Sequence, residues 1–183
     1  MCHYAPGRCS LLVLQYKNGE NVSDSVELLI SMLVRYPEIG TINYDPETNN
    51  IKVTFMMLKL FEEQALEAFR QTLLSCLETL HFIEGEKPEL LEVNYSFCED
   101  VTLVDVKRDV RTLSGEEISL TIMIVRECFA DFLMSDSEDE AGGDELLQDE
   151  ELIGKLLENV RYTVADKKLL AFREEGRVMV FNK

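Results

Sequence analysis

The feature that most constrains this sequence is a turn between two short runs of strand-forming residues. Residues 39–44, IGTINY, and residues 51–55, IKVTF, are rich in β-branched and aromatic side chains. The connecting residues 45–50 are DPETNN: the proline fixes its φ angle, the aspartate before it can accept turn amides, and either asparagine tolerates the left-handed backbone. The pattern therefore predicts a β-hairpin that turns around Pro46.

Strands and helices are also expected on both sides of this hairpin. Residues 10–16, SLLVLQY, are apolar on both faces of a strand, as in a central strand that is covered on both sides. Ser23 or Asp24 can cap a helix with apolar residues at helical spacing, which Pro37 stops. A second helix is expected over residues 60–82, followed by a strand in which residues 91, 93, 95 and 97 share the buried face.

The order strand, helix, strand, strand, helix, strand over residues 10–98 resembles the ferredoxin-like fold. Residues 26–55 look similar to the heavy-metal-associated and ACT-type modules built on that fold. Metal-binding members carry a cysteine pair in the loop after the first strand, whereas that loop here is residues 17–21, KNGEN. The resemblance therefore implies the fold but no metal-carrier function.

The rest of the chain is expected to add elements to this half. Residues 101–128 predict a long hairpin of two strands that turns at Ser114-Gly115, with Ile118, Leu120, Ile122 and Ile124 on one face. The C-terminal residues predict a helix and a hairpin that turns at residues 175–176. The predicted class is α+β, with a main domain over 1–134, an acidic flexible linker over 135–145, and a helix-hairpin unit over 146–183 that docks on the main domain or on a second subunit.

Negative charge is concentrated in one segment. Of a formal net charge of -17, residues 127–154 supply eleven acidic side chains and no Lys or Arg. Such a run is a solvated spacer, or a tail that contacts a basic surface. It does not fit an EF-hand that starts at Asp136, because Ala141 and Leu147 stand where glycine and glutamate are required. Ser135 and Ser137 leave phosphorylation and helix capping open.

The cysteines indicate in which cellular compartment the protein is expected and whether it could bind a metal. Their number, five, is odd, and no apolar run approaches the length of a membrane span, so we expect reduced thiols, a cytoplasmic protein and no membrane contact. Cys2, His3 and Cys9 are the weak candidates for a metal site, because a zinc site needs about four ligands and these are three near a terminus. No metal and no cofactor are therefore predicted.

Catalytic signatures are missing from the sequence. It contains no G-x-S-x-G, P-loop, G-x-G-x-x-G or H-E-x-x-H motif, and its only histidines are His3 and His81. His81 falls at the end of a predicted helix, where a structural histidine or a cation at the helix terminus is the simpler interpretation. No catalytic residue is assigned, and an enzyme is not indicated.

One basic cluster stands out from the acidic background. Lys107, Arg108, Arg111 and, on the expected paired strand, Arg126 are candidate ligands for an anion, and their alternative role is to protect an edge strand by charge. Nucleic acid is not expected as a partner, because the third strand lacks exposed aromatics and residues 1–126 carry a net charge of -9.

These observations predict a non-catalytic binding or regulatory module that acts through protein-protein contact or as a homo-oligomer. The alternative is a small-anion ligand sensor or a small enzyme whose site lies between sheet and helices.

Overall fold

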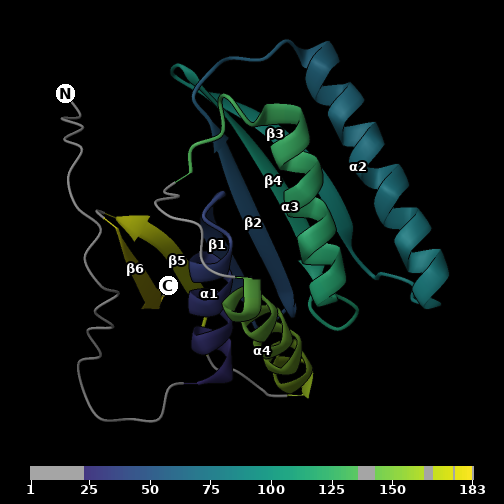
Figure 1. Cartoon of the computed structure of the whole chain (residues 1–183), viewed down its shortest axis with the longest axis vertical. Coiled ribbons are helices and arrows are strands. Elements are labelled where there is room, and N and C mark those ends of the chain that lie inside the picture. Colours follow the sequence, from purple (N-terminus) through teal and green to yellow (C-terminus); the bar gives the residue numbers. More distant parts are fainter. Residues whose placement is uncertain (1–22, 136–142, 163–166, 175, 183) are drawn as a thin grey trace.

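The computed structural model describes residues 23–135, 143–162, 167–174 and 176–182 (Figure 1). In chain order its elements are α1 (Asp24–Arg35), β1 (Ile39–Asp45), β2 (Asn50–Met57), α2 (Glu63–Glu84), β3 (Leu91–Cys98), β4 (Val101–Asp109), α3 (Gly115–Phe129), α4 (Gly143–Tyr162), β5 (Leu169–Glu174) and β6 (Arg177–Asn182). The strands form one antiparallel sheet in the order β3-β4-β2-β1-β5-β6. The predicted α+β class is confirmed.

The hairpin around Pro46 forms as predicted. β1 and β2 pair antiparallel from Asp45 opposite Asn50 to Ile39 opposite Phe55. The Asp45 carboxylate accepts a hydrogen bond from the Glu47 amide at 3.1 Å, and Asn49 takes a φ of 51°, the left-handed conformation that closes the turn. These local contacts are encoded in adjacent residues, which explains why the sequence predicts them.

Both helices that flank this hairpin are also confirmed. Ser23 caps α1 by accepting a hydrogen bond from the Val26 amide at 3.4 Å. α2 ends at Gly85, whose φ of 71° is the left-handed conformation that glycine adopts without a Cβ clash. The buried face of α2 packs toward β3 and α3, and its members recur at helical spacing: Leu66, Phe69, Leu73, Leu77 and His81.

The prediction of a second strand after Ser114 is wrong. Residues 115–129 form α3, and the Ser114 hydroxyl caps this helix by accepting a hydrogen bond from the Glu117 amide at 3.1 Å. The segment is rich in β-branched residues, but its buried positions follow a period of 3 to 4: Glu117, Ile118, Thr121, Ile122, Ile124, Val125 and Phe129. Packing of this stripe against the sheet and α2 overrides the strand propensity of the individual residues.

β4 takes a position in the sheet that the ferredoxin-like resemblance assigns to another segment. It pairs along its length with β3 on one side and β2 on the other, so it occupies the central position that the resemblance gives to residues 10–16. Residues 10–16 lie outside the described residues. The detailed ferredoxin-like topology is therefore not confirmed, although α1-β1-β2-α2-β3 follow the predicted order.

The C-terminal helix and hairpin join the same sheet. β5 pairs antiparallel with β1, and α4 packs against α1 and α3. Gly176, with a φ of 73°, stands in the turn between β5 and β6 as predicted. Of the acidic segment expected as a linker over 135–145, residues 136–142 lie outside the described residues, and α4 begins at Gly143.

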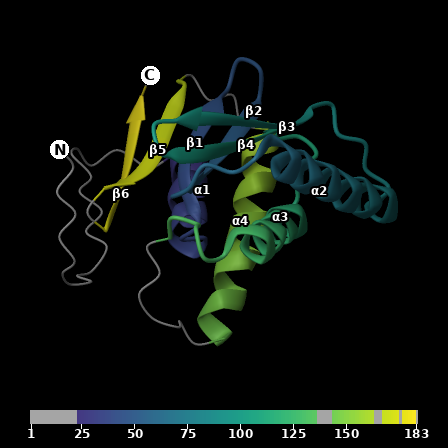
Figure 2. The same ribbon diagram turned by 90° about the horizontal axis from the view of Figure 1, so that it is seen from above.

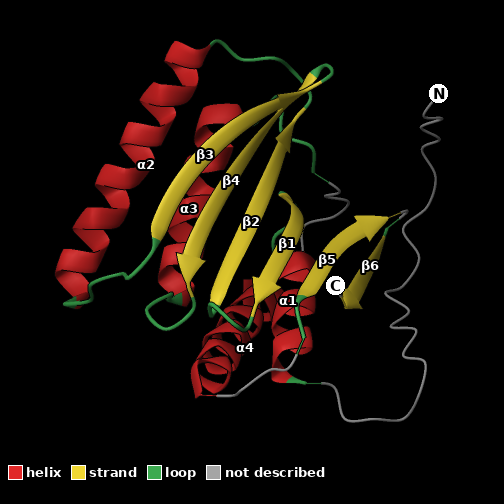
Figure 3. Cartoon of the chain, turned by 180° about the vertical axis from the view of Figure 1, so that it is seen from behind, coloured by secondary structure: helices red, strands yellow, loops and turns green. Residues whose placement is uncertain are grey.

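The four helices of the described residues all lie on one face of the sheet. The view from above shows this arrangement, and the view from behind shows the sheet in front of the helices (Figures 2 and 3). The core fills the space between the two layers and includes Leu33, Ile42, Phe55, Leu73 and Val125. None of the helices in the described ranges is long and apolar enough to cross a membrane.

Candidate functional site

The predicted site residue Arg108 is buried on the helix side of the sheet. Only 2% of its surface is exposed, and its guanidinium group is surrounded by acceptors. Nε and Nη2 bond the two oxygens of Glu117 at 2.5 and 2.9 Å, Nη1 bonds Asp109 at 2.5 Å and the Leu90 carbonyl at 2.7 Å, and Nη2 also bonds Thr112 at 3.2 Å. These five hydrogen bonds equal the five N–H groups of an arginine, so none is left to bind an anion.

His81 and Asp109 extend this network. His81 Nε2 lies 2.9 Å from Glu117 Oε2, so the histidine is a buried structural residue, one of the two roles expected from the sequence. Asp109 accepts hydrogen bonds from the backbone amides of Glu89, Leu90 and Thr112. The network therefore ties α2, the end of β4 and the start of α3 together.

Charge and hydrogen bonding fix the protonation states in this network. Burial raises the pKa of Asp109, but the Thr112 hydroxyl, the Leu90 amide and the Arg108 charge outweigh it, so the pKa lies below its usual value. Burial likewise lowers the pKa of Arg108, but Glu117 and Asp109 more than reverse that effect. Both groups are held in their charged forms, which suits a structural ion network.

A small cavity lies beside this network, between the sheet and α3. Its volume is about 30 Å³, and its walls include Phe55, Val106, Arg108, Glu117 and Ile122. That volume holds a water molecule or two, whereas ligand pockets usually measure roughly 300–1,000 Å³. The sequence raises the alternative of a small-anion sensor or an enzyme with a site between sheet and helices. The cavity beside Arg108 is too small for such a ligand.

The four predicted anion-binding residues do not meet in one place. Lys107 and Arg108 are successive strand residues and so point to opposite faces of the sheet. Arg111 is exposed and bonds Glu89 at 2.7 Å. Arg126 was expected on a strand paired with β4, but it lies on α3, where it bonds the buried Glu38. The structure therefore does not bring these four side chains together, and an anion site made by them stays a prediction.

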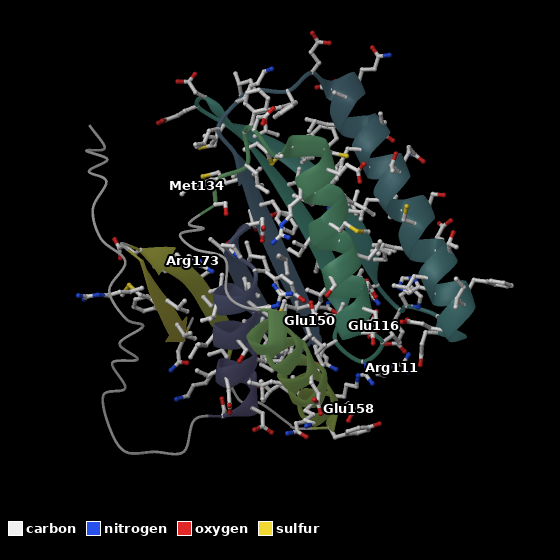
Figure 4. All side chains as sticks on the ribbon, viewed as in Figure 1. Arg111, Glu116, Met134, Glu150, Glu158 and Arg173 are labelled. Carbon is white, nitrogen blue, oxygen red and sulfur yellow. The ribbon has the colours of Figure 1, made fainter. Side chains whose placement is uncertain are left out.

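A second polar group links α1, α3 and α4. The Tyr36 hydroxyl lies 2.8 Å from Ser119 Oγ, and Arg35, whose guanidinium stacks 5.0 Å above the Tyr36 ring, bonds Glu150 at 2.7 Å. Burial raises the pKa of Tyr36 above its usual value. Because these groups bond one another, this cluster is best explained as the contact that holds the C-terminal helix in place. Figure 4 labels Glu150 on α4, between α1 and α3.

The outer face of the sheet, the face turned away from the helices, has two halves. Its rows run from Glu92 through Lys107 and Lys52 to Asn43, and from Asn94 through Asp105 and Thr54 to Thr41. Asp105 accepts from Thr54 Oγ1 at 2.5 Å and from Lys52 Nζ at 3.4 Å. On β5 and β6 the same rows continue into an apolar group, which we call the outer-face patch: Leu170, Phe172, Met179 and Phe181.

Two aromatic rings of the outer-face patch stack on each other. Phe172 and Phe181 stack with their ring centroids 5.6 Å apart and an angle of 12° between the planes. Phe181 is 45% exposed. The sequence pattern of residues 169–182 places these side chains on one side of a hairpin, but only the pairing of β5 with β1 shows that they continue the open face of the whole sheet.

Another group of exposed apolar side chains lies where β2 and β3 end. Two backbone hydrogen bonds connect residues 132–134 to the end of β2: the Leu58 amide donates to the Phe132 carbonyl, and the Met134 amide donates to the Met56 carbonyl. Met134 lies at the opposite end of α3 from Arg111 and Glu116 (Figure 4). The exposed members are Leu58, Leu60, Phe97, Phe132 and Met134.

Metal ligands are not assembled in the described ranges. The weak candidates Cys2, His3 and Cys9 lie outside those ranges, and within them no three His, Cys, Asp or Glu side chains gather around a point that could hold a metal ion. Cys76, Cys98 and Cys128 are free thiols.

Comparison with known proteins adds no assignment: no protein-family model, curated protein or solved structure matches the chain.

Proposed function

We propose that this protein is a non-catalytic binding module that associates with a second copy of itself through the outer face of its sheet. The observation that carries the proposal is the one-sided cover of the sheet: every described helix packs on the same face (Figures 2 and 3). Two-layer domains bury one face of a sheet, and an antiparallel sheet can leave the other face to water or to a partner.

The size of the outer face suits a protein partner better than a small ligand. Six strands about 4.8 Å apart, with about seven residues of about 3.3 Å each, span on the order of 700 Å². A standard protein interface buries about 800 Å² on each partner. The outer-face patch, on β5 and β6 at one end of the sheet, supplies apolar surface for such an interface.

Charge supports a second copy as the partner. Two chains of net charge -17 repel each other, so self-association requires a surface without excess negative charge. The outer face meets this condition, because each of its exposed acidic side chains has a basic neighbour. Glu92 stands opposite Lys107, Asp105 bonds Lys52, Asp45 bonds Lys168, and Glu174 stands opposite Arg177.

A pair of matched substitutions tests this proposal. Phe181→Glu places a charge in the outer-face patch, whereas Phe82→Glu makes the same change on α2, where the phenyl ring is 87% exposed on the helix side. Size-exclusion chromatography with light scattering, over a range of protein concentrations, should give a mass that approaches twice 21.0 kDa for the wild type. Phe181→Glu should stay at the monomer mass, and Phe82→Glu should behave as the wild type.

Two results would count against the proposal. One is a wild-type monomer at every concentration tested. The other is a dimer that Phe181→Glu leaves intact, because that dimer would use another surface. Circular dichroism of each variant checks that the sheet is retained.

A further inference from the structure

The exposed apolar side chains where β2 and β3 end form one surface, which we call the end patch. Its members are between 38% and 60% exposed: Leu58, Leu60, Phe97, Phe132 and Met134. One cross-strand row runs through this end of the sheet, and it consists of Phe97, Thr102, Met57 and Leu133. Soluble domains rarely leave large apolar side chains gathered in this way, and such a surface with a polar rim usually marks a site for another protein.

Hydrogen bonds hold the loop of the end patch in place. The Thr102 hydroxyl donates to the Lys59 carbonyl at 2.7 Å and accepts from the Phe61 amide at 3.2 Å, and Thr102 is buried. The Leu58 amide donates to the Phe132 carbonyl at 2.7 Å. Because these bonds fix the loop before α2, a partner meets an apolar surface that is already formed, which lowers the entropic cost of binding.

The rings of the end patch already hold a positive charge. Lys59 Nζ lies 4.5 Å from the centroid of the Phe132 ring and 5.3 Å from that of the Phe61 ring. The two rings meet edge to face, with their centroids 5.6 Å apart. A ring face attracts a cation because its π electrons carry negative charge. The lysine of the chain itself therefore shows which charge this surface accepts beside its apolar groups.

The charges around the end patch are almost all negative. Residues 57–63, 96–102 and 127–135 carry the patch, and they contain six exposed acidic side chains and a single basic one, Lys59. The acidic residues, which we call the rim, are Glu62, Glu63, Glu99, Asp100, Glu127 and Asp131. An acidic rim attracts a basic partner, and it repels both an anionic membrane surface and the same rim on a second copy.

We propose that the end patch binds a basic amphipathic helix of another protein. Large apolar side chains of that helix cover Leu58, Leu60 and Phe132, and its lysine or arginine side chains lie over the rim. The apolar contacts supply affinity, and the charges select and orient the partner. The backbone groups that fix the loop are already bonded within the chain, so the partner has to satisfy its own backbone, as a helix does.

A synthetic helical peptide of about 18 residues, with leucine on one face and lysine on the other, tests this proposal. Its binding to the full chain, followed by fluorescence anisotropy at about 0.15 M salt, should be saturable. Leu58→Ser and Phe132→Ser should each weaken binding by at least about fivefold. Phe82→Ser is the matched control, because this exposed ring stands at the far end of α2, and it should leave binding unchanged.

Matched charge changes test the rim. Asp100→Asn with Asp131→Asn removes two negative charges beside the end patch, and Glu116→Gln with Glu158→Gln removes two away from Met134 (Figure 4). Both double variants have the same net charge, so they differ only in local attraction. The first pair should weaken binding by about threefold or more and reduce its dependence on salt, and the second pair should do neither.

Several results would overturn the inference: no saturable binding to the wild type, equal binding of a peptide with glutamate in place of lysine, an equal loss from Phe82→Ser, or equal losses from the two charge pairs. Circular dichroism checks the fold of each variant. Should Phe132→Ser unfold the chain, Leu58→Ser replaces it, because the Leu58 side chain is 60% exposed.

The inference is independent of the proposed self-association. The end patch lies on β2 and β3, whereas the outer-face patch lies on β5 and β6 at the other end of the sheet. Phe181→Glu should therefore bind the peptide as the wild type does. A loss of binding in that variant would place the peptide on the outer face and overturn the assignment to the end patch.

Discussion

Arg108 and Glu117 meet in a two-pronged ion pair inside the protein, with Nε 2.5 Å from Oε1 and Nη2 2.9 Å from Oε2. Arg108 stands near the end of β4, and Glu117 is in the first turn of α3. The pair therefore fixes where α3 begins relative to the sheet, and both side chains are 98% or more buried.

Glu117→Ala should destabilise the protein by about 3–5 kcal/mol, because it leaves the Arg108 charge buried without its main partner. The matched control is Glu89→Ala, which removes the partner of exposed Arg111 and should cost no more than about 1 kcal/mol. Chemical denaturation followed by circular dichroism measures both. Equal losses for the two variants would show that the buried pair contributes no more than a surface pair.

Asp109 should make the free energy of unfolding depend on pH in the acid range. Because its pKa is lower in the folded protein than its unfolded value of about 3.9, the carboxylate stabilises the fold fully above that value. This contribution is lost as the pH falls through the lower, folded pKa. The free-energy difference between wild type and Asp109→Asn should be constant from pH 7 to 5 and shrink below about pH 4. Thr112→Val, which removes a hydroxyl donor to Asp109, should show a smaller dependence than the wild type. A difference that grows toward low pH would contradict this assignment.

Ser114→Ala should cost about 1 kcal/mol of stability, because the hydroxyl that caps α3 is lost. Ser96→Ala on β3 is the control, since Ser96 is exposed on the outer face and its loss should change stability by less than about 0.5 kcal/mol. Thermal and denaturant unfolding of the two variants give the comparison. A neutral Ser114→Ala would mean that another group caps the helix.

Met123 and Val125 distinguish a helix from a strand at α3. On a strand the two side chains share one face, whereas in α3 Met123 is 56% exposed and Val125 is fully buried. Val125→Ala should cost about 1–3 kcal/mol, and Met123→Ala should be nearly neutral, within about 0.5 kcal/mol. Similar losses at both positions would support the strand that the sequence pattern suggests.

The sequence predicts those elements whose signals are local. The turn at residues 45–50 and the stop at Gly85 depend on neighbouring residues alone, and both are found. At α3 two local signals compete: the alternation of Ile118, Leu120, Ile122 and Ile124 favours a strand. The S-x-x-E pattern that starts at Ser114 favours a helix start, and the helix is found.

The candidate site was beyond prediction for a different reason. The sequence suggests Arg108 as an anion ligand because it stands among other basic residues. Its partners Glu117, Asp109 and Leu90 are set instead by how α3 and the loop before β3 meet the sheet. The outer-face patch likewise requires the pairing of β5 with β1, which joins distant parts of the chain. Such contacts leave no periodic signal in the sequence.

That long-range pairing sets the order in which a newly synthesised chain can fold. Residues 39–109 contain four strands of the sheet, and these strands leave the ribosome long before Leu169. Until β5 is translated, β1 is the exposed edge of a four-stranded intermediate, and loop closure over so many residues slows its capture. A message that ends early, before β5, therefore yields a chain whose open β1 favours aggregation over function.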